Sequence, residues 1–282
     1  MMFASISQIN QRIAADYGQE MLHTVVPQVP AVVEQYAPIS LSEMASVALL
    51  NRTDTKFVMA AETLLAGLSQ LQNDYRVLEI EGVRLYNYRT LYFDTADFTL
   101  CYRHHAGALD RYKVRSRAYL DSRLSFFEVK HKTNKKRTIK NRLQTPHIKT
   151  SVNRDTARFL TDYYPHEAAE LLLALWNSFV RVTLVSNHRP ERLTLDFDLA
   201  FQIGPKRLSL PGVAIAEVKR DGFFAYSDFV QQMRLLGVRP TSFSKYCLGV
   251  SYFYPELKHN NFKPKHLLVQ KLMRGDSHGY YR

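Results

Sequence analysis

Apolar and polar residues alternate along two parts of the chain, residues 84–132 and 179–219, both rich in Tyr, Phe, Val, Arg and Thr. Because successive side chains of a β-strand point to opposite faces of a sheet, this period of two predicts strands. Residues 154–176 between them have a helical pattern that Pro165 interrupts or redirects. Further helices are expected over residues 42–51, 62–71 and 227–236, with a short strand over 56–59. Strands and helices do not alternate regularly, which favours an α+β fold with an antiparallel sheet.

One predicted strand, residues 111–119, has a polar face of a single charge sign. Alternation places Arg111, Lys113, Arg115 and Arg117 on this face. Neighbours on one face are about 6.6 Å apart, so each adjacent pair repels by about 2.5 kcal/mol at an effective dielectric constant near 20. An ordinary solvated sheet face usually mixes charge signs, whereas this stripe predicts a bound anion.

Other predicted strands repeat this design, with a few carboxylates among the cations. Their charged faces carry Glu128, Lys130, Lys132, Arg181, Arg192, Asp196, Asp198, Glu217 and Lys219. In the strand over 192–199, the opposite face receives Leu193, Leu195, Phe197 and Leu199. Sparse carboxylates inside a basic site suit a divalent metal that bridges phosphates. If the sheet closes, an antiparallel β-barrel tunnel with a charged lumen results, and helices pack outside it.

The overall charge agrees with an anionic partner. The chain has 38 Lys and Arg against 26 Asp and Glu, a formal net charge of +12, which is typical of proteins that bind phosphates, nucleic acid or membrane head groups. Nucleic acid is disfavoured, because most aromatic residues alternate onto the strand face opposite the cations. The only two cysteines, Cys101 and Cys247, are far apart in the sequence, and neither a signal peptide nor a membrane-spanning run is visible. We expect a cytoplasmic protein.

Eight short motifs occur in an order that resembles the catalytic domain of the vacuolar transporter chaperone (VTC) polyphosphate polymerases, part of the triphosphate tunnel metalloenzyme superfamily. The resemblance covers roughly residues 42–254. The motifs are Arg52-Thr-Asp-Thr-Lys56, Tyr92-Phe-Asp-Thr95, Arg111-Tyr-Lys-Val-Arg-Ser-Arg117, Phe127-Glu-Val-Lys130, Lys140-Asn-Arg142, Arg192-Leu-Thr-Leu-Asp196, Glu217-Val-Lys219 and Ser242-Phe-Ser-Lys-Tyr246.

The resemblance implies a polyphosphate polymerase that transfers the γ-phosphate of a nucleoside triphosphate to a growing polyphosphate chain. The residues that it places on the phosphate path as catalytic groups are Lys56, Arg115, Arg117, Lys130, Arg181, Arg192 and Lys245. Candidate substrate-binding residues are Arg52, Lys113, Lys140, Lys219 and Ser244. Glu217 would bind the Mn²⁺ or Mg²⁺ ion.

The sequence departs from the superfamily pattern at its amino-terminal Glu-x-Glu-x-Lys motif, which here reads Arg52-x-Asp54-x-Lys56. Loss of one metal-binding carboxylate argues against a hydrolase with a two-glutamate metal site and fits the polymerase branch. Phe179 replaces an expected tyrosine and Ser242 an expected lysine. A triphosphate hydrolase of the same fold and a non-catalytic polyphosphate-binding module stay open as alternatives, as does a membrane-protein partner.

The chain is expected to divide into three parts. Residues 1–41 form an amino-terminal accessory arm, residues 42–254 the tunnel domain and residues 255–282 a basic tail. Oligomeric state is not defined by these features.

Overall fold

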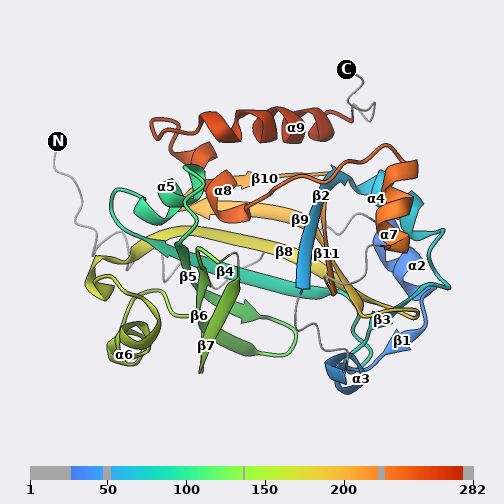
Figure 1. Cartoon of the computed structure of the whole chain (residues 1–282), viewed down its shortest axis with the longest axis horizontal. Helices are drawn as coiled ribbons and strands as arrows, with labels where there is room; N and C mark the ends of the chain where they lie inside the picture. Colours follow the sequence, from blue (N-terminus) through green and yellow to red (C-terminus); the bar gives the residue numbers. More distant parts are fainter. Residues whose placement is uncertain (1–26, 47–51, 136, 222–225, 276–282) are drawn as a thin grey trace.

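The computed structural model describes residues 27–46, 52–135, 137–221 and 226–275. Over these residues one large sheet has the strand order β2-β11-β9-β8-β4-β5-β6-β7, with antiparallel pairs throughout this path (Figure 1). Its strands are β2 (Arg52–Ala60), β4 (Tyr86–Asp94), β5 (Arg111–Tyr119), β6 (Leu124–Lys132), β7 (Thr138–Thr145), β8 (Leu172–Ser186), β9 (Glu191–Ile203) and β11 (Val213–Asp221). Three short strands at its margin are β1 (Pro38–Ile39), β3 (Tyr75–Leu78) and β10 (Lys206–Ser209). The α+β fold with an antiparallel sheet is confirmed.

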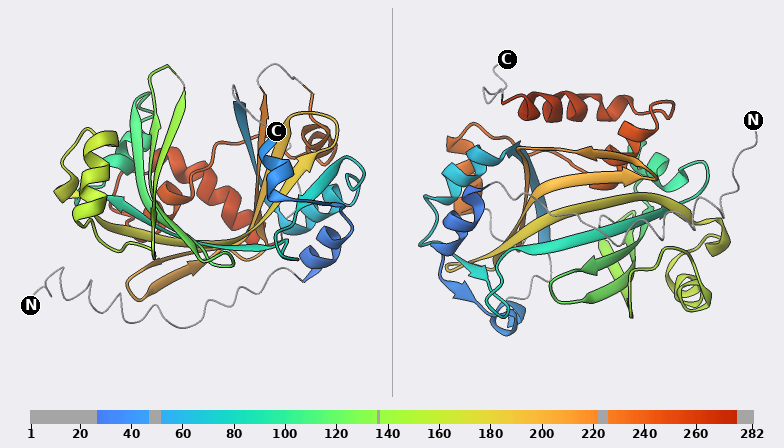
Figure 2. Two further views of the ribbon diagram at one scale, coloured as in Figure 1. Left: turned by 90° about the horizontal axis from the view of Figure 1, so that it is seen from below. Right: turned by 180° about the vertical axis from the view of Figure 1, so that it is seen from behind.

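The sheet curves into an open trough instead of closing into the expected barrel. Strands β5, β6 and β7 form one wall, β2 and β11 form the other, and β4, β8 and β9 form the floor (Figure 2, left). In the part of the chain that the structure describes, β2 and β7 end the strand order and do not pair with each other. We call the concave side of this sheet the inner face.

Helices cover the outer face of both walls. The helical segments of the described residues are α2 (Gln28–Glu34), α3 (Leu41–Ser46), α4 (Ala61–Leu68), α5 (Thr99–His105), α6 (Arg154–Tyr163), α7 (Asp228–Leu235), α8 (Lys245–Phe253), α9 (Lys263–Met273) and the 3₁₀ turns η2 (Ala168–Glu170) and η3 (Asn260–Phe262). None of these helices is long and apolar enough to cross a membrane.

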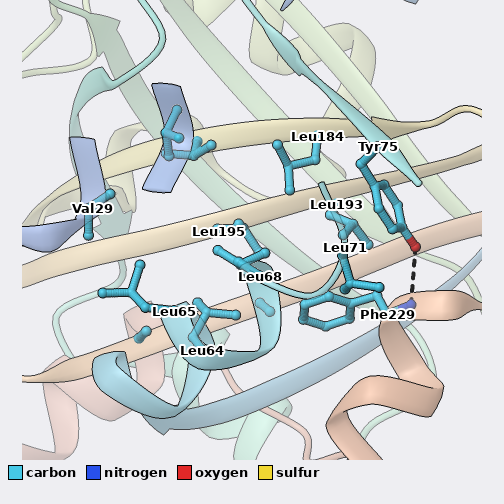
Figure 3. Close-up of a cluster of buried hydrophobic side chains, with 14 of the residues drawn as sticks. Val29, Leu64, Leu65, Leu68, Leu71, Tyr75, Leu184, Leu193, Leu195 and Phe229 are labelled. Carbon is cyan, nitrogen blue, oxygen red and sulfur yellow. Dashed lines mark hydrogen bonds between the residues drawn. The ribbon is translucent and has the colours of Figure 1, made fainter. Parts of the chain in front are cut away.

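The largest apolar cluster lies between the outer face of β2, β8, β9 and β11 and helices α2, α4 and α7 (Figure 3). Leu64 and Leu68 of α4 are buried against Leu195 of β9. Tyr75 of β3 is fully buried, and its hydroxyl accepts a 3.1 Å hydrogen bond from the backbone N–H of Phe229 in α7. The apolar strand face therefore packs outward, as the alternation predicts.

The structure corrects the helix that was expected over 154–176. The α-helix α6 covers only Arg154–Tyr163, a single 3₁₀ turn η2 follows at Ala168–Glu170, and β8 begins at Leu172. Residues 174–176 are buried in the middle of the sheet, where a short apolar run has no periodicity to distinguish strand from helix.

Two helices beside the trough were not expected from the sequence. Helix α5 begins after β4, and buried Asp94 accepts hydrogen bonds of 2.8 Å and 2.9 Å from the N–H groups of Leu100 and Cys101. Helix α8 begins at Ser244, whose hydroxyl accepts a 3.3 Å hydrogen bond from the N–H of Cys247. Both helices begin with a side chain that satisfies otherwise unpaired N–H groups.

Helices α8 and α9 lie at one end of the trough and bridge its walls, so not all helices pack outside (Figures 1 and 2). At this end the inner face is apolar and forms a second buried cluster with them. Tyr246 of α8 stacks on Tyr92 of β4 with ring centroids 4.8 Å apart, and Val269 of α9 is fully buried.

A β-bulge explains how one strand supplies both clusters. Asp198 in β9 has a left-handed φ of 50°, and the register with β8 shifts between Ser178 and Val180. Phe197 therefore belongs to the outer cluster, whereas Leu199 belongs to the cluster beneath α8. The expectation of strict alternation through Leu199 is wrong at this point because the extra residue reverses the faces.

Candidate functional site

The stripe of cations on β5 lies on the inner face of the trough. The β5–β6 register places Lys113 opposite Lys130 and Arg115 opposite Glu128. Tyr112 and Val114, on the other face of the strand, are buried in the apolar cluster against α6. The alternation in the sequence thus correctly predicts which side chains face the concavity.

Glu128 of β6 connects cations of the two neighbouring strands, β5 and β7. Its carboxylate accepts a 2.6 Å bond from Arg115 Nε and contacts Lys140 of β7. Only 1% of the Glu128 side chain is exposed. Burial opposes its ionisation, but Arg115, Arg117 and Lys140 outweigh burial and hold the pKa of Glu128 at about 2. Glu128 is therefore an ionised counter-charge within the basic site.

Asp196 of β9 is a second ionised counter-charge, on the floor of the trough. Arg181 of β8 makes a two-pronged contact with it, at 2.5 Å from Nε and 2.8 Å from the second terminal nitrogen, and Lys245 of α8 also binds this carboxylate. Burial opposes ionisation, but the two cations hold the pKa of Asp196 well below its ordinary range. Helix α8 thus contributes Lys245 to the site.

Glu217 lies on the wall opposite β5. One carboxylate oxygen contacts Lys56 of β2, and the other accepts a 2.8 Å bond from Lys219, which also donates to Thr194 Oγ1 at 3.0 Å. Burial opposes ionisation of Glu217, but Lys219 and Lys56 hold its pKa below the ordinary range. Burial also lowers the pKa of Lys219 to about 8.

Three further inner-face cations make no ion pair among the described residues. Lys113 Nζ donates a 2.8 Å hydrogen bond to Ser244 Oγ, and Arg117 Nε donates one of 3.0 Å to Thr90 Oγ1. Burial and the nearby charge of Lys113 lower the pKa of Lys130 to about 7. This surplus of cations over carboxylates leaves the site ready to bind an anion.

Two predicted site residues differ from the others: Arg192 lies at the margin of the site, and only the backbone of Arg52 is described. Arg192 of β9 lies opposite Lys219 of β11 in the strand register, so the basic side chains of the inner face continue toward the end of β11. Arg52 begins β2, but its side chain lies outside what the structure describes. The other predicted residues, Lys56, Lys113, Arg115, Arg117, Lys130, Lys140, Arg181, Glu217, Lys219, Ser244 and Lys245, lie on or beside the inner face.

A divalent metal at Glu217 fits the chemistry of this site. No group of three or more His, Cys, Asp or Glu residues surrounds a common point in the described residues, so the chain offers no complete cage. Mg²⁺ and Mn²⁺ are commonly held by one or two carboxylates together with substrate phosphates. Ionised Glu217 supplies such a carboxylate, provided that the ion displaces the ammonium groups of Lys56 and Lys219.

Sequence reasoning missed the aromatic part of the inner face. Tyr88, Tyr119, Phe126 and Phe179 lie beside Arg117 on this face, although most aromatic residues were expected on the opposite face. The signal was present, because alternation along 111–119 puts Tyr119 on the same face as the cations. Counting the aromatic residues of each face strand by strand would have found them.

The fold and site define a class of protein: an antiparallel trough whose inner face holds surplus cations around two buried carboxylates, Glu128 and Asp196, and the partly exposed Glu217. The family model described as "VTC domain" matches residues 51–254, and the chain belongs to this family. No curated protein matches the chain.

Several solved structures are similar to the chain at low identity. A putative adenylate cyclase from Bacillus halodurans is 15% identical, with a TM-score of 0.40 over 69% of this chain and 94% of that one. A putative adenylate cyclase from Vibrio parahaemolyticus is 12% identical, with a TM-score of 0.39 and the same coverage. A putative adenylyl cyclase from Hippeastrum, described as having a dominant triphosphatase activity, is 12% identical, with a TM-score of 0.40 over 71% of this chain and 96% of that one.

Proposed function

We propose that the chain is a metal-dependent polyphosphate polymerase that binds a nucleoside triphosphate and a polyphosphate chain on the inner face of the trough. The observation that supports this most strongly is the surplus of cations. Glu128, Asp196 and Glu217 each contact two cations, and Lys113, Arg117 and Lys130 add positive charge without a carboxylate partner in the described chain. Phosphate oxygens would supply the missing negative charge.

The carboxylates keep this site organised before substrate arrives. Arg115 and Arg181 are held in place by Glu128 and Asp196, and their planar guanidinium groups can bind phosphate oxygens in a two-pronged geometry. Ordering long side chains costs conformational entropy, and here the cost is met during folding. Binding of a phosphate chain then exchanges contacts of Lys140, Lys245 and Lys56 from carboxylate to phosphate oxygens.

Phosphoryl transfer needs in-line positioning and neutralisation of the equatorial oxygens more than it needs covalent help. The terminal phosphate oxygen of the growing chain attacks the γ-phosphorus of the nucleotide, the bond to the bridging oxygen breaks, and nucleoside diphosphate leaves. Because the attacking group is already an anion, no general base is required. The role of Arg115, Arg117 and Lys130 is to hold both phosphate groups and balance their charge.

A divalent ion held by Glu217 and phosphate oxygens would add positive charge at the transferred group. Glu217 is ionised, partly exposed and directed toward the same basic surface, so it could hold the ion. The use of Mn²⁺ or Mg²⁺, the binding of ATP and a cytoplasmic location are parts of this proposal.

A hydrolase of the same fold is the second candidate, favoured by the open trough. Strands β2 and β7 do not pair among the described residues, and the inner-face side chains of Lys56 and Lys140 are 29% and 38% exposed, so water can reach them. A non-catalytic polyphosphate-binding module is the third. Product identity separates the first two candidates, and binding without turnover identifies the third.

The test is incubation of the purified protein with ATP and Mn²⁺, with and without a short polyphosphate primer, and analysis of chain length on a gel. A ladder of chains longer than the primer, formed together with ADP, supports the polymerase. Orthophosphate without a ladder indicates the hydrolase. The ladder should be lost in Arg115→Ala but kept in Arg158→Ala, which removes an exposed cation from α6 on the outer side of the wall.

A further inference from the structure

Four aromatic side chains form a connected cluster on the otherwise charged inner face. Tyr88 stacks on Phe179 with ring centroids 5.1 Å apart and contacts Tyr119 at 4.9 Å. Tyr119 in turn meets the edge of Phe126 at 5.8 Å. Phe179 is fully buried, whereas the other three are partly exposed toward the trough. We call these four residues the aromatic cluster.

Tyr119 and Phe126 form the end of the aromatic cluster that is remote from α8, whereas Phe179 lies 4.3 Å from Lys245 Nζ of α8. On β5, Lys113 contacts Ser244 at the start of α8, and Arg115, Arg117 and Tyr119 follow on the same face. Each step along a face is about 6.6 Å, so Tyr119 lies roughly 20 Å from Lys113 along the strand. A ligand whose phosphates contact Arg115 and Arg117 would place its next chemical group against Tyr119.

Arginines are layered over these rings. Arg117 Cζ is 5.5 Å from the ring centroid of Tyr88 and 5.8 Å from that of Phe179. On the neighbouring strands, the exposed guanidinium of Arg142 lies 4.7 Å over Phe126. Planar aromatic and guanidinium groups are the surfaces on which nucleobases stack, with little dependence on base identity.

We propose that the aromatic cluster, with Arg142, binds the base of the nucleoside triphosphate donor. The inference rests on the proposed function, because it assumes that the donor's phosphates lie on Arg115, Arg117 and Lys130. Stacking on Tyr119 and Phe126 distinguishes a nucleotide from an inorganic chain with the same phosphates. It also gives the donor one orientation, with the base away from α8.

The simpler explanation is that the rings only pack against the guanidinium groups of Arg117 and Arg181 and hold them in position. Arg181 Cζ also lies 5.0 Å from the Tyr88 centroid. Under that explanation, removing a ring would weaken the binding of nucleotide and of inorganic triphosphate equally. Tyr119 and Phe126 separate the two explanations, since both are partly exposed and neither lies under Arg117 or Arg181 in the described contacts.

The experiment compares the affinities of ATP and tripolyphosphate by calorimetry in the presence of EDTA, which prevents metal-dependent turnover. The variants are Tyr119→Leu and Phe126→Leu, and the control is Tyr163→Leu, which removes a partly exposed tyrosine of α6 outside the trough. We expect ATP binding to weaken about 5- to 100-fold in the two trough variants, while tripolyphosphate binding changes less than about twofold. Unchanged tripolyphosphate binding also shows that each variant is folded.

Equal weakening of both ligands, or no weakening of ATP binding, would overturn the base site and leave the proposed phosphate site intact. A wild-type protein that binds neither ligand would overturn the proposed function together with this inference. An ATP-specific loss in Tyr163→Leu would also overturn it.

Discussion

Lys113 and Ser244 are 131 positions apart in the chain, yet the ammonium group of Lys113 donates a 2.8 Å hydrogen bond to the hydroxyl of Ser244. This contact joins the wall of the trough to the N-cap residue of α8. The next residue, Lys245, binds Asp196 on the floor. Helix α8 therefore closes one end of the trough and also completes the cationic site, so the docking of this helix and the geometry of the site depend on each other.

Tyr246 anchors α8 through both its hydroxyl and its ring, and Tyr246→Phe should loosen the helix. The Tyr246 hydroxyl donates to the buried carboxylate of Asp94, and its ring stacks on Tyr92. Phenylalanine keeps the stacking but leaves Asp94 without one donor, at a cost of about 1–3 kcal/mol in the free energy of unfolding. Chemical denaturation measures this cost.

Tyr252→Phe on the same helix is the matched control. The Tyr252 hydroxyl is buried but has no hydrogen-bond partner in the described residues, so its removal should change stability by less than about 0.5 kcal/mol. Equal destabilisation by the two substitutions would contradict the assigned role of the Tyr246–Asp94 hydrogen bond.

Glu128→Gln should destabilise the fold by roughly 3–5 kcal/mol, because it leaves the largely buried positive charge of Arg115, whose side chain is 16% exposed, without its counter-charge. The folded-state pKa of Glu128, about 2, lies below the ordinary value of 4.5. The stabilisation is therefore present above pH 4.5 and is lost as pH falls toward 2. Denaturation at pH 7 and at pH 3 should show a larger difference between wild type and variant at pH 7.

The control for Glu128 is Glu79→Gln. Glu79 pairs with Arg84 at 2.6 Å but is 32% exposed, so its loss should cost less than about 1 kcal/mol. A Glu128 variant as stable as the Glu79 variant would show that the inner-face ion pair contributes nothing to folding.

Phosphate binding should weaken as pH rises above 7 because Lys130 loses its proton. Its pKa in the free protein is about 7, and a bound anion raises that pKa by favouring the charged form. Below pH 7 Lys130 is already charged; between pH 7 and 8 binding requires proton uptake, and affinity falls by up to tenfold per pH unit. In Lys130→Arg the charge is permanent, so the dissociation constant of tripolyphosphate should vary less over this range.

The control is Lys135→Arg, which changes an exposed residue between β6 and β7. Its dissociation constant for tripolyphosphate should vary with pH as that of the wild type does. The same slope in all three proteins would show that Lys130 is not the source of the pH dependence.

Glu217→Gln should separate metal use from phosphate binding. Loss of this carboxylate removes the proposed metal ligand and frees Lys56 and Lys219 for phosphate. Turnover with ATP and Mn²⁺ should fall at least 100-fold, while tripolyphosphate affinity in EDTA stays equal or increases. Glu43→Gln, an exposed carboxylate paired with Arg76, should change neither quantity. Full turnover in Glu217→Gln would exclude Glu217 as a metal ligand.

The inner face of the sheet could be predicted from the sequence because strand alternation is a local rule. It placed Lys113, Arg115 and Arg117 together correctly, and it predicted the outward apolar face. The rule failed at Asp198, where a bulge reverses the faces. Nothing in the local pattern distinguishes such a bulge from a regular strand, since the shift depends on pairing with β8.

Long-range arrangement was less accessible to sequence reasoning. The contacts of Glu128 with Lys140, and of Asp196 with Lys245, depend on how β7 and α8 are placed in space. The open trough depends on whether the edge strands β2 and β7 meet, and alternation carries no information on this. The domain boundaries expected at residues 41 and 254 stay predictions, although Val29 of α2 and Val269 of α9 are both buried.

The central claim is that phosphate chains bind to the inner face, and Lys130 tests it most directly because its removal leaves no carboxylate unpaired in the described chain. The measurement is the dissociation constant of a short polyphosphate chain for wild type, Lys130→Gln and the outer-face control Arg158→Gln, all at pH 6.5, where Lys130 is charged. The two variants lose the same net charge. We expect at least tenfold weaker binding in Lys130→Gln and less than twofold change in Arg158→Gln. Equal effects of the two substitutions would show that only net charge attracts the chain, and would contradict a binding site in the trough.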